Sequence, residues 1–260
     1  MKPFLFYHEN FSIPSFAFML MMASLVATGF AYLMAPRNKL SQIIILDLGI
    51  LGTIAAIIGG RLFHVFVEEF GYYLQHPSHI YQIWRGGFVS YGAFIGLGVA
   101  FTLYLKTFRK TAALPYLDHL AVYACPFVDF FVRLGCLLAG CCYGTPTDSF
   151  LSMVFHTGDA GSKYPGVPLH PTQLYSMAAA LINFGFLVWL KKRQTFRGQL
   201  ITSFLLFYAV SRFLIEFLRG DPERGVYLDN AISTAQIMSI ITVVAAGIVY
   251  FICKKKFPLR

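Results

Sequence analysis

Two pairs of oppositely charged residues lie within long apolar stretches of the sequence. Asp129 and Arg133 form one pair, and Arg212 and Glu216 form the other, each with its members four positions apart. In a helix this spacing places both side chains on one face, where they can pair. Arginine carries a planar fork of donors that suits the oxygens of a phosphate. The pairs therefore predict either a site for a phosphate group or ion pairs that hold helices together.

Further polar residues extend this pattern. Tyr208 and Arg219 continue the expected helix face of Arg212 by one turn in each direction, and Arg61 follows two glycines in an earlier apolar stretch. A lone charge at the centre of a bilayer costs at least about 2.5 kcal/mol, so several charges on three segments favour a shared hydrated cavity. We therefore interpret Arg133 and the two later arginines jointly as functional. For Asp129 and Arg133 taken alone, a phosphate site and a structural ion pair both stay open.

The stretch after Arg133 is rich in glycine and cysteine. Gly144 is one of its glycines, which permit turns and close backbone approach. Cys136, Cys141 and Cys142 suggest a metal or redox site, but neither a histidine nor a second cysteine pair stands at ligand spacing. We therefore interpret the cysteines as small apolar side chains that fill space in the helices.

The motif His170-Pro-Thr-Gln-Leu-Tyr175 opens a later apolar stretch. Pro171 suits the first turn of a helix. We place His170 at the membrane interface and expect Gln173 and Tyr175 to direct hydrogen-bonding groups into the helix bundle. The alternative is a polar and aromatic anchor at the interface that takes no part in chemistry.

The composition indicates an all-α integral membrane protein. Hydrophobic residues form 57% of the 260 positions and charged residues only 13%, whereas a soluble domain is about a quarter charged. The apolar residues fall into about seven runs, each long enough to cross ~30 Å of hydrocarbon as a helix. We see no cleavable signal peptide before the first run. We expect a single domain over residues 1–260, with spans near 14–35, 43–70, 88–105, 116–139, 171–190, 199–219 and 233–253. The third run is short and glycine-rich, which is typical of a partly re-entrant segment.

The basic residues predict the orientation of these spans. Thirteen of the 21 lysines and arginines gather in four patches between or after the apolar runs. The positive-inside rule places the patches in the cytoplasm, with the amino terminus outside and the carboxyl terminus cytoplasmic. The remaining loops then face outward and carry the site. This distribution explains the net charge of +9 without nucleic acid as a partner. The patches are Arg37 and Lys39; Lys106, Arg109 and Lys110; Lys191, Lys192, Arg193 and Arg197; and Lys254, Lys255, Lys256 and Arg260.

Taken in order, the motifs resemble the bacterial prolipoprotein diacylglyceryl transferases, the family that carries out the first step of lipoprotein maturation. The resemblance covers nearly the whole chain, and that family also has seven spans with an outer amino terminus. The matching motifs are Gly59-Gly60-Arg61, the glycine-rich stretch from Gly86 to Gly96, Arg133-Leu-Gly135, Tyr143-Gly144, His170 to Tyr175, Arg197-Gly-Gln199, and the spaced set Tyr208, Arg212, Glu216 and Arg219.

The resemblance implies a reaction in the bacterial cytoplasmic membrane, with the active site toward the outer leaflet. A diacylglyceryl group moves from phosphatidylglycerol to the thiol of a lipobox cysteine in a prolipoprotein, and glycerol phosphate leaves. By this resemblance, Arg133 and Arg212 bind the phosphate and stabilise its charge, with Glu216 and Tyr208 orienting Arg212. No metal or organic cofactor is implied. The other residues expected in the phosphatidylglycerol site are Arg219, Gly144 and Gln173.

The chain also departs from the family pattern. Tyr91 stands where the family usually has a histidine with a catalytic role, and an unperturbed tyrosine, with a pKa of about 10, is a poor base at neutral pH. Tyr91 either acts by hydrogen bonding or is made more acidic by the arginines, or His170 accepts the proton instead. Cys136 and Cys141 replace the family's asparagine and glutamate, which indicates a diverged member.

Two alternatives to this function stay open. The first is a related lipid-modifying transferase with another acceptor or donor, in one form of which Cys141 or Cys142 is a covalent nucleophile. The second is a transporter of an anionic solute that uses the same arginines as its binding site. No pair of broken helices in matching halves supports the transporter.

The role of Tyr91 can be tested by removing its hydroxyl group. A catalytic Tyr91 predicts that Tyr91→Phe lowers the turnover number strongly while expression stays normal, because the phenyl ring keeps the shape but cannot hydrogen bond. A packing role predicts a nearly neutral change. Initial rates of lipid transfer at saturating substrate, measured on equal amounts of the two folded proteins, separate these outcomes.

Overall fold

The computed structural model describes residues 2–8, 11–82, 87, 89–220, 226–227 and 232–259. The chain divides into two compact units: unit 1 consists of Met1–Met34 and Leu117–Arg260, and unit 2 consists of Ala35–Tyr116. The residues expected to bind phosphate all belong to unit 1, whereas Arg61 and Tyr91 belong to unit 2. One domain over residues 1–260 stays a prediction.

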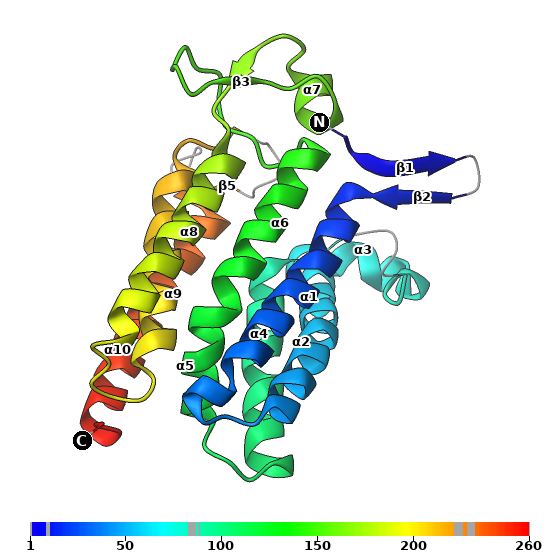
Figure 1. Ribbon diagram of the computed structural model, residues 1–260. Helices are drawn as coiled ribbons and strands as arrows, with labels where there is room; N and C mark the ends of the chain where they lie inside the picture. Colours follow the sequence, from blue (N-terminus) through cyan, green and yellow to red (C-terminus); the bar gives the residue numbers. More distant parts are fainter. Residues whose placement is uncertain are drawn as a thin grey trace. The chain divides into compact units, whose positions relative to one another are not determined.

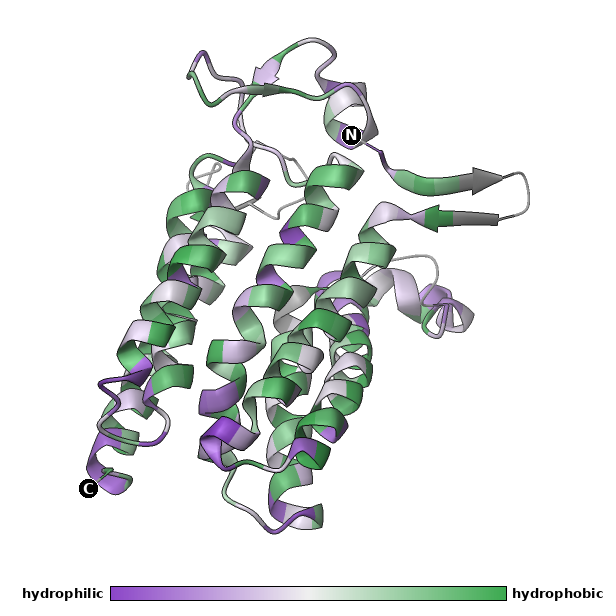
Figure 2. Ribbon diagram, in the orientation of Figure 1, coloured by the Kyte–Doolittle hydropathy of each residue, from purple (hydrophilic) through white to green (hydrophobic). Residues whose placement is uncertain are grey.

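Five helices of the described part are long and apolar enough to cross a membrane. They carry exposed apolar side chains such as Leu25, Ile50 and Val244. Figure 2 shows hydrophobic residues along most of the length of these helices. An apolar outer surface of this kind is stable in lipid rather than in water, so the all-α, multi-pass class is confirmed. The number of seven spans and the orientation stay predictions. The five are α1 (Ser15–Met34), α2 (Gln42–Phe63) with the π-helical turn η2 (His64–Glu68), α8 (Thr172–Lys191), α9 (Gln199–Glu216) and α10 (Thr234–Lys256).

The sequence suggested one continuous helix at 116–139, but the structure has two helices there. They are α5 (Ala113–Tyr123) and α6 (Cys125–Ala139), which meet at a bend of 42°. Pro126 opens α6, and a proline both lacks an amide donor and clashes with the preceding turn. Counted as one bent span, the pair raises the number of candidate spans in the described residues to six.

The glycine-rich run at 88–105 forms α4 (Ser90–Leu103) and the π-helical turn η5 (Tyr104–Phe108), whose apolar part, Gly92–Phe108, is shorter than the other spans. Its glycines serve close packing against α2. A Cβ atom added at Gly92 would lie 2.3 Å from the carbonyl oxygen of Gly59. Small residues allow such backbone contact between helices in a membrane.

In unit 1 the helices α1, α6, α8, α9 and α10 pack as successive neighbours (Figure 1). The hairpin of β1 (Phe4–His8) and β2 (Phe11–Pro14) precedes α1 at one end of the unit. The same end holds the segment from α6 to α8, in which α7 (Gly158–Lys163) lies between the paired strands β3 (Met153–Val154) and β4 (Pro168–Leu169). A third short pair, β5 (Val226–Tyr227) and β6 (Ile232–Ser233), leads into α10.

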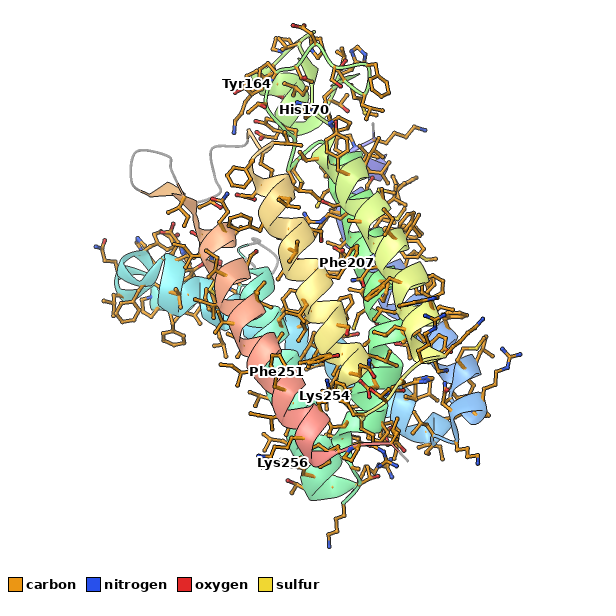
Figure 3. All side chains as sticks on the ribbon, turned by 90° about the vertical axis from the view of Figure 1, so that its left-hand side faces the viewer. Tyr164, His170, Phe207, Phe251, Lys254 and Lys256 are labelled. Atoms are coloured by element: carbon orange, nitrogen blue, oxygen red, sulfur yellow. The ribbon has the colours of Figure 1, made fainter. Side chains whose placement is uncertain are left out.

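The basic patches of unit 1 gather at its other end. The turn after α8 pairs with the chain beyond α10, because the Arg197 amide donates to the Phe257 carbonyl at 3.0 Å and the Leu259 amide donates to Thr195 at 2.7 Å. Figure 3 shows His170 at one end of the unit and Lys254 and Lys256 at the other. The basic patches of unit 1 and His170 therefore lie at opposite ends of this unit, while the orientation in the membrane stays a prediction.

Arg61, which the sequence marked as a buried charge, has a structural role in unit 2. Its guanidinium donates to the carbonyl oxygens of His79 at 2.7 Å, Ile80 at 3.1 Å and Gly87 at 3.3 Å. The helix α3 (Phe70–Gln75) is followed by the 3-10 turn η3 (Pro77–His79). The hydrogen bonds of Arg61 join α2 to the end of η3 and to the chain beyond it. Several carbonyl oxygens thus compensate the burial of this charge.

Asp118 caps α9 from the neighbouring helix α5. Its carboxylate accepts hydrogen bonds from the amides of Gly198 at 2.6 Å and of Leu200 and Ile201, both at 3.0 Å. A fourth bond comes from Gln194. The first amides of a helix have no partner within that helix, and a carboxylate also interacts favourably with the helix dipole. Asp118 therefore fixes the start of the helix that carries Tyr208, Arg212 and Glu216.

We expect Asp118→Ala to lower the free energy of unfolding by roughly 2 kcal/mol or more, because it leaves several buried amides without an acceptor. Asp118→Asn should cost less, since its oxygen still accepts. The measurement is thermal unfolding in detergent micelles, with the exposed Asp148 changed to alanine as the control. Equal midpoints for Asp118→Ala and Asp148→Ala would contradict this role.

Candidate functional site

The end of α9 carries a buried carboxylate between two arginines. Glu216 is 2% exposed, and one of its carboxylate oxygens accepts from the Nη1 atom of Arg212. The same oxygen lies 3.8 Å from the Nη1 atom of Arg219. One carboxylate thus faces two guanidinium groups, which leaves positive charge at this end of α9.

The sequence suggested that Arg219 extends the helix face of Arg212, but the structure shows that it does not. The helix α9 ends at Glu216, and Arg219 lies in the turn beyond it. Its amide donates to the Glu216 carbonyl at 3.2 Å, which is a turn-like bond rather than a continued helix. The turn brings Arg219 back toward Glu216, so the two arginines approach one carboxylate from different backbone directions.

The second predicted pair, on α6, lies near the first. The Nε atom of Arg133 is 3.7 Å from Asp129, which is beyond hydrogen-bonding distance. This Nε atom is buried and has no hydrogen-bond partner among the described residues. Asp129 also interacts electrostatically with Arg212. The structure therefore brings the two charged pairs together, as the idea of a shared site required.

Tyr208 connects the two helices. Its hydroxyl is a hydrogen-bonding partner of Arg133, and it lies close enough to Arg212 and Asp129 to interact with their charges. The resemblance assigned Tyr208 to orienting Arg212, and that role stays a prediction, since Tyr208 interacts with Arg133 as well as with Arg212. Tyr208 therefore links α9 to α6 at the level of the arginines.

Gly144 lies where three backbone segments meet. Its amide donates to the His170 carbonyl at 2.9 Å, and the Thr145 amide donates to the Leu218 carbonyl at 2.9 Å. The Gly220 amide donates to the Tyr143 carbonyl at 3.1 Å. A β-bridge also pairs Gly144 with Arg219. This crossing fixes the turn that carries Arg219.

The first turn of α8 holds the chain that follows α6. The Gln173 side chain donates to the Cys141 carbonyl and the Thr172 hydroxyl donates to the Cys142 carbonyl, both at 2.6 Å. Gln173 is 1% exposed, and its Oε1 atom has no hydrogen-bond partner among the described residues. An acceptor of this kind is expected to bind a ligand donor, because an unsatisfied buried polar atom is costly.

His170 is joined to this site through its backbone. Its side chain lies 3.0 Å, from Nδ1 to the hydroxyl oxygen, from Tyr175. The described contacts therefore place the His170 ring with Tyr175 rather than with the arginines. Tyr91 lies on α4, but its side chain is outside the described residues, so its expected role stays a prediction.

Three cysteines that the sequence analysis treated as packing residues form a cluster. The Sγ atoms of Cys136, Cys141 and Cys142 all lie within 4.8 Å of one another, and all three thiols are free. Gly140 takes a left-handed conformation, with φ of 71°, and turns the chain so that Cys141 returns to the last turn of α6. The signal in the sequence was a glycine placed one residue before the vicinal pair.

The pKa values of the two thiols beyond α6 are shifted in opposite directions. Hydrogen bonds with Cys136 and Cys141, together with the charges of Arg219 and Arg133, hold the pKa of the Cys142 thiol well below its usual range. Hydrogen bonding to Cys136 and Cys142, with burial, raises the pKa of the Cys141 thiol. Of these two thiols, the one that interacts with Arg219 and Arg133 is therefore the more acidic.

We expect Gly144→Ala to abolish the activity of this site. The new Cβ atom would lie 2.5 Å from the Cβ of His170 and 2.6 Å from the carbonyl oxygen of Leu218, so the crossing must open and Arg219 must move. Gly185→Ala is the matched control, because nothing lies within 4 Å of a Cβ at that position of α8. Activity and monodispersity of both variants test the prediction, and full activity of Gly144→Ala would refute it.

Comparisons with known proteins identify the family to which the chain belongs. The family model described as prolipoprotein diacylglyceryl transferase matches residues 3–253. Phosphatidylglycerol–prolipoprotein diacylglyceryl transferase 2 of Clostridium perfringens is 33% identical over 247 residues, which cover 94% of this chain and 92% of that protein. The transferase of Clostridium tetani is 31% identical over 250 residues, covering 96% and 97%. That of Nitrosospira multiformis is 30% identical over 223 residues, covering 84% and 73%. The chain belongs to the prolipoprotein diacylglyceryl transferase family.

Proposed function

We propose that this protein transfers the diacylglyceryl group of phosphatidylglycerol to the thiol of the lipobox cysteine in a prolipoprotein. The family model and the relatives support a transferase of the first step of lipoprotein maturation. The bond between the diacylglyceryl carbon and the phosphate oxygen breaks, and a carbon–sulfur bond forms. The thiol proton passes to a base, and glycerol phosphate leaves with the bonding electrons.

The arginine cluster carries this proposal. A phosphate that leaves takes on negative charge in the transition state, and preorganised donors aimed at that charge lower the barrier. Arg133, Arg212 and Arg219 outnumber the two carboxylates that face them. The buried Nε atom of Arg133 offers a donor that no described residue uses. We assign the phosphate to Arg133 and Arg212.

The remaining residues hold these arginines in place or bind the lipid headgroup. Glu216 orients Arg212 and Arg219, and Tyr208 orients Arg133. Gln173 has an open acceptor that suits a hydroxyl of the glycerol headgroup, and Gly144 keeps the backbone close to the site. Tyr91 and His170 are the groups we propose for the thiol proton.

The site lies toward the outer leaflet in this proposal. The basic turn after α8 and the basic end of α10 lie together at one end of unit 1, which the positive-inside rule assigns to the cytoplasm. The end that contains His170 then faces outward, where a secreted precursor presents its cysteine (Figure 3).

The test is a transfer assay with purified protein in nanodiscs that contain phosphatidylglycerol, a lipobox peptide as acceptor and mass spectrometry of the thioether product. We expect Arg133→Ala and Arg212→Ala each to lower the rate by about 100-fold or more, as for the loss of a donor to a developing anion. Arg193→Ala is the control, because this arginine stacks on Trp189 in the basic turn, 4.6 Å from the ring centre.

The same variants should be compared in a strain depleted of its own transferase. Wild type and Arg193→Ala are expected to restore growth, and the two site variants are not. Folded wild-type protein that forms no thioether, or an Arg212→Ala variant that restores lipidation fully, would refute the proposed function and favour an anionic-solute transporter with the same arginines.

A further inference from the structure

The cysteine cluster is the part of unit 1 that the proposed reaction does not use. Cys136 lies on the last turn of α6, and Cys141 and Cys142 follow the left-handed Gly140. Their three Sγ atoms lie within 4.8 Å of one another, and Cys136 is buried. A packing role requires only a small apolar side chain at each position. It does not require that three thiols converge on one point.

The backbone holds these thiols in place from two sides. The Cys141 amide donates to the Cys136 carbonyl at 3.1 Å, which fixes the return of the chain. From the opposite side, Gln173 and Thr172 of α8 hold the carbonyl groups of Cys141 and Cys142. The cluster is therefore preorganised by its own backbone, as ligand positions in built metal sites are.

We propose that Cys136, Cys141 and Cys142 bind one monovalent copper ion through three sulfur atoms. Metal–sulfur bonds of about 2.3 Å place three sulfurs about 4 Å apart around a trigonal ion. The thiols reach this geometry with small shifts from their spacing of at most 4.8 Å.

The number of ligands selects the ion. Structural zinc sites are almost always four-coordinate, whereas soft thiolate ligands also select monovalent copper. No histidine, carboxylate or further cysteine joins the three thiols among the residues that the structure describes. Binding releases the protons that the three thiols still carry, so affinity rises with pH.

The site is electrostatically coupled to the arginines. Arg133 lies one helical turn before Cys136 on α6. A β-bridge joins Arg219 to Gly144, which follows Cys142 by two residues, and both arginines interact with the Cys142 thiol. Three thiolates and one monovalent cation carry two net negative charges, which offset the positive field that receives the phosphate. Copper binding is therefore expected to inhibit lipid transfer, a consequence that rests on the proposed function.

Binding is measured first, independently of activity. Purified protein in nanodiscs is titrated anaerobically with monovalent copper against a chromogenic copper chelator, and the copper–sulfur distances are determined by X-ray absorption. We expect one tightly held ion per chain with three sulfur neighbours. Each single change, Cys136→Ser, Cys141→Ser or Cys142→Ser, should weaken copper binding by more than about 100-fold. This is more than the loss expected when a residue that only supports a ligand is removed.

The matched control is the double variant Cys125→Ser/Cys253→Ser, which removes the two cysteines outside the cluster and should bind copper as wild type does. Circular dichroism confirms that each variant is folded. Wild type that retains no copper, binding that survives the loss of any one cluster cysteine, or binding that is lost in the double variant would each overturn the proposal.

Inhibition is measured second, as the rate with copper divided by the copper-free rate of the same protein. Wild type and the double variant should lose activity with copper and regain it with the chelator, while Cys141→Ser should be insensitive. Tight copper binding by a wild-type protein that makes no thioether would leave the metal site standing and refute the proposed function. Active protein that binds copper without inhibition would overturn the proposed coupling.

Discussion

The burial of guanidinium groups within an apolar helix bundle is the constraint on which the rest of unit 1 depends. Removing an unpaired ion from water costs several kcal/mol, and breaking a buried pair costs about 3–5 kcal/mol. Glu216 meets this constraint for two arginines at once, because it pairs with Arg212 and lies 3.8 Å from Arg219. Among the described residues, Arg133 interacts with Tyr208, with the two nearby thiols and with Asp129 at 3.7 Å. The buried Nε atom of Arg133 has no hydrogen-bond partner among the described residues, and for this reason we propose this arginine for the phosphate.

Residues of unit 1 outside the arginine cluster hold that cluster in position. Asp118 fixes the start of α9, and the backbone crossing at Gly144 fixes the turn after its end. The first turn of α8 holds the chain beyond α6 through Gln173 and Thr172. Both ends of the arginine-bearing helix are thus set by residues from other segments. Such support is what a site needs if its donors are to be placed before the substrate arrives.

Length and hydropathy were enough to predict the spans, because a helix in lipid needs about 20 apolar residues. Five of the seven predicted runs are helices of that kind. The bend before Pro126 and the short α4 were less accessible, since backbone geometry and helix packing decide them rather than hydropathy. Charge spacing predicted the pairing of Arg212 with Glu216, because that contact is local. Arg219 was placed wrongly on the helix, because its position depends on a bridge to Gly144 that lies far away in sequence. The cysteine cluster was missed for a different, local reason: a left-handed Gly140 makes neighbours of residues that a helical projection separates.

The contact between α2 and α4 has a consequence for movement in unit 2. A Cβ atom at Gly92 would lie 2.3 Å from the Gly59 carbonyl oxygen, and one at Gly96 would lie 2.6 Å from that of Ala55, so the two backbones touch with no side chain between them. Sliding one helix along the other would bring larger residues such as Phe63 and Phe101 into a space that only a hydrogen atom fits. The contact therefore favours one register of the two helices and opposes sliding of α4 along α2.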